Sequence, residues 1–414
     1  MTIKRFEIIQ IIGELLAEQA SRGLSEKAIT GETLLVKDLG LSSVEFVIIF
    51  ERLQRRSGDV INFIDLIMPD RSSYIEDLSI NQIANFLLKN KNNQPRITNL
   101  DDPYINQRAP ITQHDIDLLD QAIRHQTYHD ETIELRTQLC FLLSAPRSGS
   151  TLLRRMLGCH DEIYAPMELH LMGYQNFSQR QQELQTSEHS HLLEGTVVAR
   201  QEIRKMRPAV SQAVEEMYSR DKRPVTQFYR EIDDHLNQDV WIDKTPSYAF
   251  SRSTLERIKS TFPQAKFIHL TRTPNAVIKS MIDSELGQLM RFQQTSGIQS
   301  DCFAEALWCL CERNILDALS TQKTKSIHIH FEELVSKPEK VMHQLHSFLG
   351  VKPSMAINPY KTTGTFTEEK IGCYAGDLKT FLRSSIDPSV TREWEKFDSL
   401  KWLSEPTKQI EKAY

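Results

Sequence analysis

The sequence predicts an α/β protein in which a large carboxyl-terminal part contains a parallel sheet and a small helical bundle precedes it. Beyond about residue 112, short apolar strands alternate with helical segments, a pattern typical of a parallel sheet covered on both faces. Before about residue 90, apolar residues recur at helical spacing. We therefore divide the 414 residues into a helical domain over 1–90, a linker over 91–111 and an α/β domain over 112–414.

The helical domain contains three predicted helices. The first is amphipathic, with apolar residues at Ile8, Ile11, Ile12, Leu15 and Leu16. The second covers 43–53, with Ser42 or Ser43 as its amino-terminal cap, and the third starts near Ser79. The segment that follows is polar, contains prolines and has no periodicity, and we interpret it as the linker.

Four short apolar segments are the predicted strands of the sheet, at 139–143, 240–242, 266–270 and 326–331. We expect a helix to begin at about Leu152, shortly after the first strand. The long Gln- and Arg-rich stretch 172–235 is predicted to be a mostly helical insertion that forms a lid over the ligand-binding end of the sheet.

The composition excludes several classes of protein. A net charge of −5 gives no support for nucleic acid or an acidic membrane surface as the main partner. No apolar run approaches the ~18 residues of a membrane span, and the first residues do not begin a signal peptide. The six cysteines are scattered and are expected to be free thiols. We therefore expect a soluble cytoplasmic protein without a bound metal.

The turn after the first strand is a predicted anion-binding loop. The sequence SAPRSGSTLLRRML, from Ser144 to Leu157, passes from a buried strand through a tight turn into a helix. This geometry directs backbone N–H groups and a helix amino terminus at one spot, which suits a phosphate or a sulfate. The ATPase pattern GxxxxGK[ST] is absent, because no lysine precedes the Ser/Thr pair. The candidate anion-binding residues are Arg147, Ser148, Gly149, Ser150 and Thr151.

A second strand–turn–helix unit follows strand 266–270. Arg272 leaves the carboxyl end of that strand, and Ser280 lies eight residues further, two turns into the next helix. Ligands of open α/β sheets bind outside the carboxyl ends of the strands. Two such units, each with an arginine and a hydroxyl, are therefore predicted to hold two separate phosphates of one nucleotide.

These segments resemble motifs of the sulfotransferase family. The loop APRSGSTLLRRML is similar to the family's 5′-phosphosulfate loop, and FIHLTRTPNAVIKSMI, with Arg272 and Ser280, is similar to its 3′-phosphate segment. WIDKTP, with Lys244, resembles the KTP element, and HFEELV at 330–335 resembles the "YEDLV" segment. The resemblance covers roughly 135–400. It implies a P-loop-like α/β sulfotransferase fold and 3′-phosphoadenosine-5′-phosphosulfate (PAPS) as the sulfuryl donor.

The resemblance also implies catalytic residues. In tyrosylprotein sulfotransferases a similar loop precedes a catalytic glutamate, and the spacing matches that from Arg147 to Glu168. Other sulfotransferases use histidine, and His170 lies two residues further, on the same face if the segment is extended. We favour Glu168 as the base and His170 as an assisting or substrate-binding group. Lys244 is the candidate partner of the bridging or sulfuryl oxygens, and Arg147 that of the leaving phosphate.

The amino-terminal unit has a resemblance of its own. The segment DLGLSSVEF, starting at Asp38, is similar to the "LGxDSL" segment of acyl carrier domains. Ser43 takes the place of the serine that carries 4′-phosphopantetheine, while Ser42 stands where carriers most often have Asp. The resemblance implies a phosphopantetheinyl transferase as a partner that modifies Ser43.

Together the two resemblances predict sulfation of a hydroxyl on a carrier-tethered acyl chain, as in the carrier–sulfotransferase pairs of polyketide-type olefin synthases. The implied partners are an upstream synthase and, for a later elimination, a separate thioesterase. Two alternatives are sulfation of a free small-molecule or lipid hydroxyl, and a carrier shuttle with a degenerate transferase domain. A kinase-like enzyme is a further alternative, although the missing loop lysine argues against it.

Overall fold

The computed structural model divides the chain into two compact units. The smaller one comprises Met1–Asp102 with Glu368–Gly372, and the larger one comprises Pro103–Thr367 with Cys373–Tyr414. The residues that the structure describes are 30–35, 37–38, 66, 77–89, 109–123, 125–128, 130–185, 190–283, 295–298, 300–321, 324–358 and 403–414. The first two predicted helices and Ser43 lie outside these residues, so the domain boundaries and the carrier assignment stay predictions.

In the smaller unit, the third predicted helix is α4 (Ile80–Lys89). Ser79 and Gln82 form a reciprocal capping box before it. The backbone N–H of Gln82 donates to Ser79 Oγ at 3.2 Å, and the N–H of Ser79 donates to Gln82 Oε1 at 2.7 Å. This capping box explains why the helix begins where the sequence predicts.

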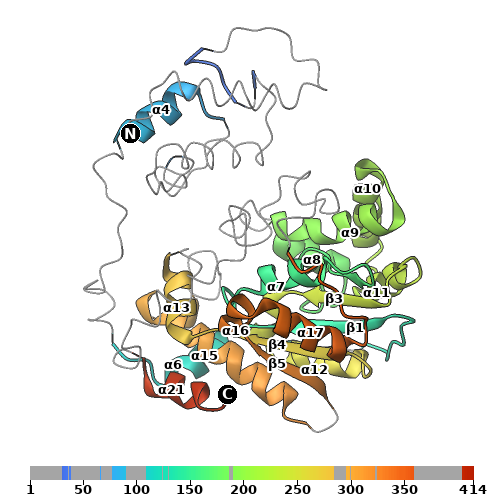
Figure 1. The fold of residues 1–414 in the computed structure, drawn as a ribbon, viewed down its shortest axis with the longest axis vertical. Helices are drawn as coiled ribbons and strands as arrows, with labels where there is room; N and C mark the ends of the chain where they lie inside the picture. Colours follow the sequence, from blue (N-terminus) through green and yellow to red (C-terminus); the bar gives the residue numbers. More distant parts are fainter. Residues whose placement is uncertain are drawn as a thin grey trace. The chain divides into compact units, whose positions relative to one another are not determined.

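The larger unit contains a five-stranded parallel sheet in the order β2-β3-β1-β4-β5. Figure 1 labels β3, β1, β4 and β5 in this sheet. The parallel α/β fold is therefore confirmed. The four predicted strands correspond to four of the five, and the short β2 was not predicted because two residues carry no periodicity. The strands are β1 Gln138–Leu143, β2 Ile163–Tyr164, β3 Val240–Lys244, β4 Lys266–Thr271 and β5 Lys325–His330.

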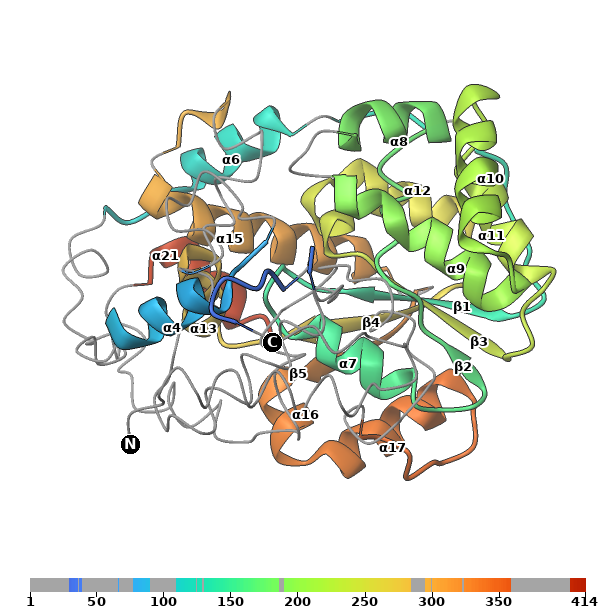
Figure 2. The ribbon, with the colours of Figure 1, turned by 90° about the horizontal axis from the view of Figure 1, so that it is seen from above.

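Helices cover both faces of this sheet. One face is covered by α7 (Ser150–Leu157), α16 (Phe331–Ser336) and α17 (Pro338–Leu349), and the other by α12 (Arg252–Thr261) and α15 (Ser300–Leu319), as Figure 2 shows. Helix α7 begins two residues earlier than expected, so Ser150 and Thr151 belong to its first turn. Further helices of this unit are α6 Gln113–Ala122, η4 Pro246–Phe250, α13 Pro274–Asp283 and α21 Glu405–Glu411.

The side chains of β1 alternate between two hydrophobic clusters. Leu139, Phe141 and Leu143 belong to the cluster on the α12–α15 face, whereas Cys140 and Leu142 belong to the cluster on the α7–α17 face. Both faces of this central strand are therefore buried, which explains why its sequence is continuously apolar.

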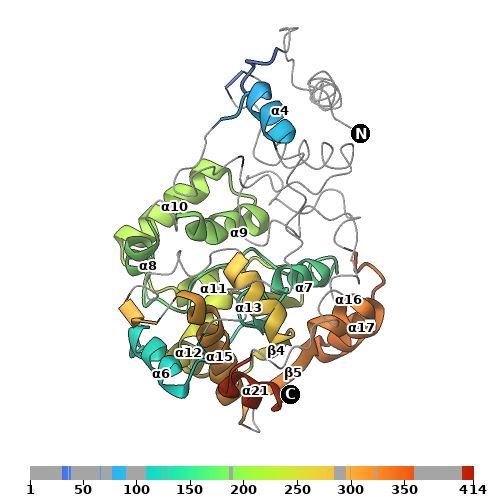
Figure 3. The ribbon, with the colours of Figure 1, turned by 90° about the vertical axis from the view of Figure 1, so that its left-hand side faces the viewer.

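The helical insertion between β2 and β3 contains α8 (Phe177–Leu184), η3 (Ser190–Leu193), α9 (Glu194–Arg204), α10 (Pro208–Arg220) and α11 (Thr226–Asp233). Figure 3 shows α9 and α10 side by side. The mostly helical character predicted for 172–235 therefore matches the structure. Within the described ranges, no helix has both the length and the apolar character that a membrane span requires.

Candidate functional site

The turn between β1 and α7 forms a cradle that only glycine can complete at position 149. Gly149 has a φ of +91°, in the left-handed region that favours glycine. A Cβ on Gly149 would lie 2.3 Å from ring carbons of Phe331, so a larger residue would collide with the side chain at the start of α16. The N–H groups of the first turn of α7 have no partner within the helix and are directed at this turn.

The Ser148 hydroxyl supports the interpretation of this turn as an anion cradle. Ser148 is fully buried, and among the described residues its Oγ has no hydrogen-bond partner. A buried polar group normally has a partner. A bound oxyanion would satisfy this hydroxyl together with the N–H groups of the helix.

The two predicted phosphate-binding segments lie side by side. Arg147 Nε donates to Ser280 Oγ on α13 at 3.1 Å, and Arg272 Nη1 donates to the carbonyl of Arg147 at 3.2 Å. Phe331 supports both segments, because the Arg272 guanidinium lies over its ring at 4.7 Å. Phe331 was not recognised as a site residue from the sequence, where it reads as the end of an apolar strand.

Glu168, His170 and Lys244 converge beside helix α7. Lys244, at the end of β3, forms an ion pair with Glu168 and donates to Thr151 Oγ1 at 3.3 Å. His170 Nε2 lies 3.1 Å from Glu168 Oε2, and His170 Nδ1 lies 3.1 Å from Ser247 Oγ. Thr151 thereby links this group to the anion loop, so all the site residues predicted in the α/β domain lie in one connected region.

The charge of Glu168 is set by its neighbours. Burial alone would raise its pKa, but the Lys244 ammonium and the His170 ring outweigh burial and hold the pKa of Glu168 well below its usual range. The carboxylate is therefore ionised at neutral pH.

The segment that carries Glu168 is not extended throughout, contrary to the assumption made from the sequence. His170 has a φ of +48°, in the left-handed region. The imidazole nevertheless contacts the Glu168 carboxylate. The contact therefore forms at a turn in the backbone and not along an extended strand.

Asp243 lies beneath this segment and organises the hydroxyls that hold it. Thr245 Oγ1 donates to Asp243 Oδ1 at 3.0 Å and accepts from the N–H of Leu169 at 3.2 Å. Tyr248 Oη donates to Asp243 Oδ2 at 3.1 Å and accepts from the N–H of Leu171 at 3.1 Å. Asp243 was not recognised from the sequence as part of the site, since there it appears only as the neighbour of Lys244.

Comparisons with a family model and with solved structures both find sulfotransferases. A family model described as "Sulfotransferase family" matches residues 140–354. The structure is similar to the sulfotransferase domain of the olefin synthase of Synechococcus PCC 7002, with 31% identity, a TM-score of 0.61, and coverage of 70% of this chain and 99% of that one. It is also similar to a sulfotransferase domain from the curacin biosynthetic pathway, with 29% identity, a TM-score of 0.61, and coverage of 68% and 98%.

Curated relatives are more distant. Protein-tyrosine sulfotransferase 2 of Gallus gallus is 25% identical over 256 residues, 60% of this chain and 59% of that protein. Nodulation protein NoeE of Sinorhizobium fredii is 25% identical over 275 residues, 62% of this chain and 59% of that protein. The chain thus spans about three fifths of the length of these relatives.

Asp243 predicts a pH dependence of stability. Burial raises its pKa from 3.8 to about 6, although three hydroxyls partly oppose this shift. The folded protein therefore binds this proton more tightly than the unfolded chain does. The resulting contribution to the free energy of unfolding, about 3 kcal/mol, is fully present below pH 3.8 and is lost as the pH rises through about 6.

The measurement is urea unfolding of the wild type and Asp243→Asn at several pH values between 4 and 7. The wild type should lose stability relative to Asp243→Asn as the pH rises. Asp239→Asn, at an exposed position just before β3, is the control and should follow the wild type. A constant difference between wild type and Asp243→Asn across this range would contradict the assignment.

Proposed function

The chain belongs to the sulfotransferase family, and from this premise we propose that it transfers a sulfuryl group from PAPS to a hydroxyl oxygen. The observation that carries the proposal is the buried pair of Lys244 and Glu168 beside Thr151. This pair places a cation and a proton acceptor directly at the helix that completes the anion loop. Binding of an anion alone would not require the carboxylate.

The residues of the loop fit such a donor. The Ser148 hydroxyl is buried without a partner among the described residues, and Gly149 supplies the left-handed backbone that the turn requires. We assign the 5′-phosphosulfate to residues 147–151 and the 3′-phosphate to Arg272 and Ser280. The donor supplies an activated sulfuryl group whose leaving group is a nucleotide phosphate.

The chain's own residues then account for the proton and the charge. Glu168, ionised because of Lys244 and His170, accepts the proton of the attacking hydroxyl as that oxygen forms its bond to sulfur. Lys244 lies between Thr151 and Glu168 and stabilises the negative charge that develops on the leaving oxygen. His170 holds the second oxygen of Glu168 and so orients the carboxylate.

We propose a carrier-tethered β-hydroxyacyl chain as the acceptor. Two observations support it: the similar sulfotransferase domains come from an olefin synthase and from the curacin pathway, and the segment around Ser43 resembles a carrier. In this proposal a phosphopantetheinyl transferase modifies Ser43, a synthase loads the arm, and a separate thioesterase acts on the sulfated product. The alternative is a free small-molecule or lipid hydroxyl; the relative named protein-tyrosine sulfotransferase 2 shows by its name that a member of this family can act on a hydroxyl other than that of an acyl chain.

Donor binding can be tested by thermal unfolding with 3′-phosphoadenosine-5′-phosphate (PAP), the product left by PAPS. At 100 times its Kd, PAP should stabilise the wild type by about 2.7 kcal/mol, and ATP should stabilise it less. Gly149→Ala should lose the effect, because the added methyl collides with Phe331 and the left-handed backbone is unfavourable for alanine. Stabilisation by ATP but not by PAP would refute the assigned donor.

The role of Glu168 can be tested with Glu168→Gln, which keeps the shape of the side chain and removes the base. We expect turnover of PAPS with a 3-hydroxyacyl pantetheine thioester to fall about 10²- to 10⁴-fold, with PAP still bound. Glu256→Gln, at an exposed position on α12 whose carboxylate pairs with Arg252, should keep full activity. Near-normal turnover of Glu168→Gln would exclude Glu168 as the base.

The carrier assignment is tested by intact mass after incubation with a phosphopantetheinyl transferase and coenzyme A. The wild type should gain the mass of one phosphopantetheine group, and Ser43→Ala should gain none. Ser42→Ala is the matched control and should be modified like the wild type. An unmodified wild type would remove the carrier from the proposal, leaving a free hydroxyl as the acceptor.

A further inference from the structure

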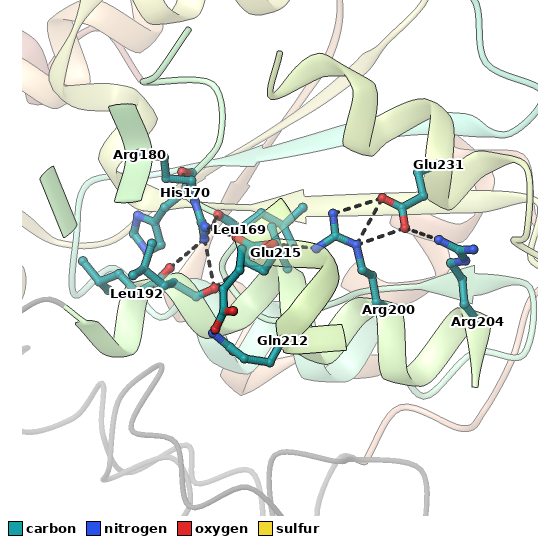
Figure 4. A network of polar contacts seen from close by, with 12 residues as sticks. Leu169, His170, Arg180, Leu192, Arg200, Arg204, Gln212, Glu215 and Glu231 are labelled. Carbon is teal, nitrogen blue, oxygen red and sulfur yellow. Dashed lines mark hydrogen bonds and ion pairs between the residues drawn. The ribbon is translucent and has the colours of Figure 1, made fainter. Parts of the chain in front are cut away.

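The buried guanidinium of Arg180 connects the helical insertion to the segment that carries Glu168 and His170 (Figure 4). Arg180 lies on α8 and is fully buried. Its Nε donates to the carbonyl of His170 at 3.0 Å, and its Nη2 donates to the carbonyl of Leu169 at 2.9 Å. Arg180 thus holds two successive carbonyls of the proposed catalytic segment.

These two hydrogen bonds explain the unusual backbone of His170. A non-glycine residue in the left-handed region costs of order 1 kcal/mol or more and persists only where its surroundings enforce it. In an extended segment, successive carbonyls point in opposite directions, so one guanidinium could not bind both. The turn at His170 brings both carbonyls to Arg180 and places the imidazole against Glu168.

On its other side, Arg180 is fixed by the insertion. Its Nη1 donates to Glu215 Oε1 at 2.7 Å, and its Nη2 also donates to the carbonyls of Leu192 and Leu193 at 3.0 and 3.2 Å. Glu215 in turn accepts from Arg200 Nη1 at 2.5 Å. The planar fork has five N–H donors, and one hydrogen of Nη2 is shared between two of its three carbonyl acceptors. A lysine ammonium has only three donors around one point.

Two further ion pairs extend this network along the insertion. Arg200 donates to both oxygens of Glu231, with Nε at 3.0 and 3.1 Å from them, and Arg204 donates to the same carboxylate at 2.5 Å. Arg200 is as buried as Arg180, and the hydrogen bonds of its guanidinium are to Glu215 and Glu231. The two arginines therefore share a partner and a degree of burial but differ in contact with the Glu168 segment.

We propose that Arg180 is a positioning residue for the transfer reaction, holding the carbonyls of Leu169 and His170 so that Glu168 stays between Lys244 and His170. This inference rests on the proposed function, since it takes Glu168 to be the base. Arg180 does not reach the reacting atoms. It acts through the backbone, and it makes the geometry of the base depend on the packing of α8, η3 and α10.

The test compares Arg180→Lys with Arg200→Lys. Each variant keeps a positive charge beside Glu215, but only Arg180→Lys loses the fork that binds the Glu168 segment. A displacement of about 1 Å of a catalytic group can cost about 10²-fold in rate. With PAPS and a 3-hydroxyacyl pantetheine thioester, we expect Arg180→Lys to lower kcat about 10- to 100-fold with KM for PAPS unchanged, and Arg200→Lys to keep kcat within about threefold.

The pH profile separates positioning from a general loss of stability. The charged groups facing Glu168 are Lys244 on β3 and His170 on its own segment, with Asp243 on β3 behind His170. If the segment loosens, Lys244 and His170 hold the pKa of Glu168 down less strongly, and that pKa rises. An acid limb of kcat/KM, which the wild type should lack down to the lowest pH at which it is folded, should therefore appear in Arg180→Lys and stay absent in Arg200→Lys.

A second pair of variants covers the case in which Arg180→Lys does not fold. Arg180→Met combined with Glu215→Gln removes one buried positive and one buried negative charge together, and Arg200 keeps its ion pair with Glu231. Glu215→Gln alone is its control, because its amide oxygen can still accept from Arg180 Nη1 and the bonds from Arg180 to Leu169 and His170 stay in place. The double variant should show the lower kcat and the acid limb, and the control should show neither.

Equal activity and equal pH profiles in Arg180→Lys and Arg200→Lys, or in the double variant and its control, would overturn the inference. In that result the wild type remains active and Glu168→Gln inactive, so the proposed function stands. If instead Glu168→Gln were as active as the wild type, the proposed base would be wrong, and the positioning role would fall with it.

Discussion

The ion pair between Lys244 and Glu168 places two opposite charges where both side chains are nearly closed to water, with exposed fractions of 1% and 15%. Removing charges from water costs several kcal/mol per ion, which the pair recovers only if its geometry is good and further hydrogen bonds complete it. Thr151 Oγ1 accepts a hydrogen bond from the Lys244 ammonium, and His170 Nε2 forms a hydrogen bond with the Glu168 carboxylate. The site therefore depends on keeping three chain segments in place: the end of β3, the first turn of α7 and the segment around Glu168. Much of the surrounding structure serves this purpose.

The segment after β2 shows how this register is maintained. It is irregular backbone in a buried place, so its N–H and C=O groups all need partners. On the sheet side, the hydroxyls of Thr245 and Tyr248 accept hydrogen bonds from the N–H groups of Leu169 and Leu171. On the insertion side, the fork of Arg180 binds the carbonyls. Donors and acceptors on opposite sides fix a stretch that neither a helix nor a sheet would stabilise.

The sequence predicted what is local. The apolar runs of β1 and β4 and the turn around Gly149 are continuous in the chain, and their patterns depend on neighbouring residues only. Two features could not be predicted. The left-handed backbone at His170 results from contacts with Arg180, which lies in a Gln-rich stretch that looks like an ordinary helix surface. Asp243 is set apart from other acidic residues only by burial beneath the proposed catalytic segment, which no sequence pattern reveals.

Another buried carboxylate lies behind the anion loop. Glu312 on α15 is fully buried; its Oε1 accepts from the N–H of Ala145 at 3.4 Å, and its Oε2 lies 2.8 Å from His269 Nε2 on β4 and accepts from Tyr414 Oη. The N–H at the start of the loop is therefore bound by a carboxylate of the protein. This limits the proposed anion cradle to residues 147–151. Glu312, bound by several donors, thus holds the start of the loop from behind. Glu168, the proposed base, is held in the same way by Lys244 and His170 in front of the loop.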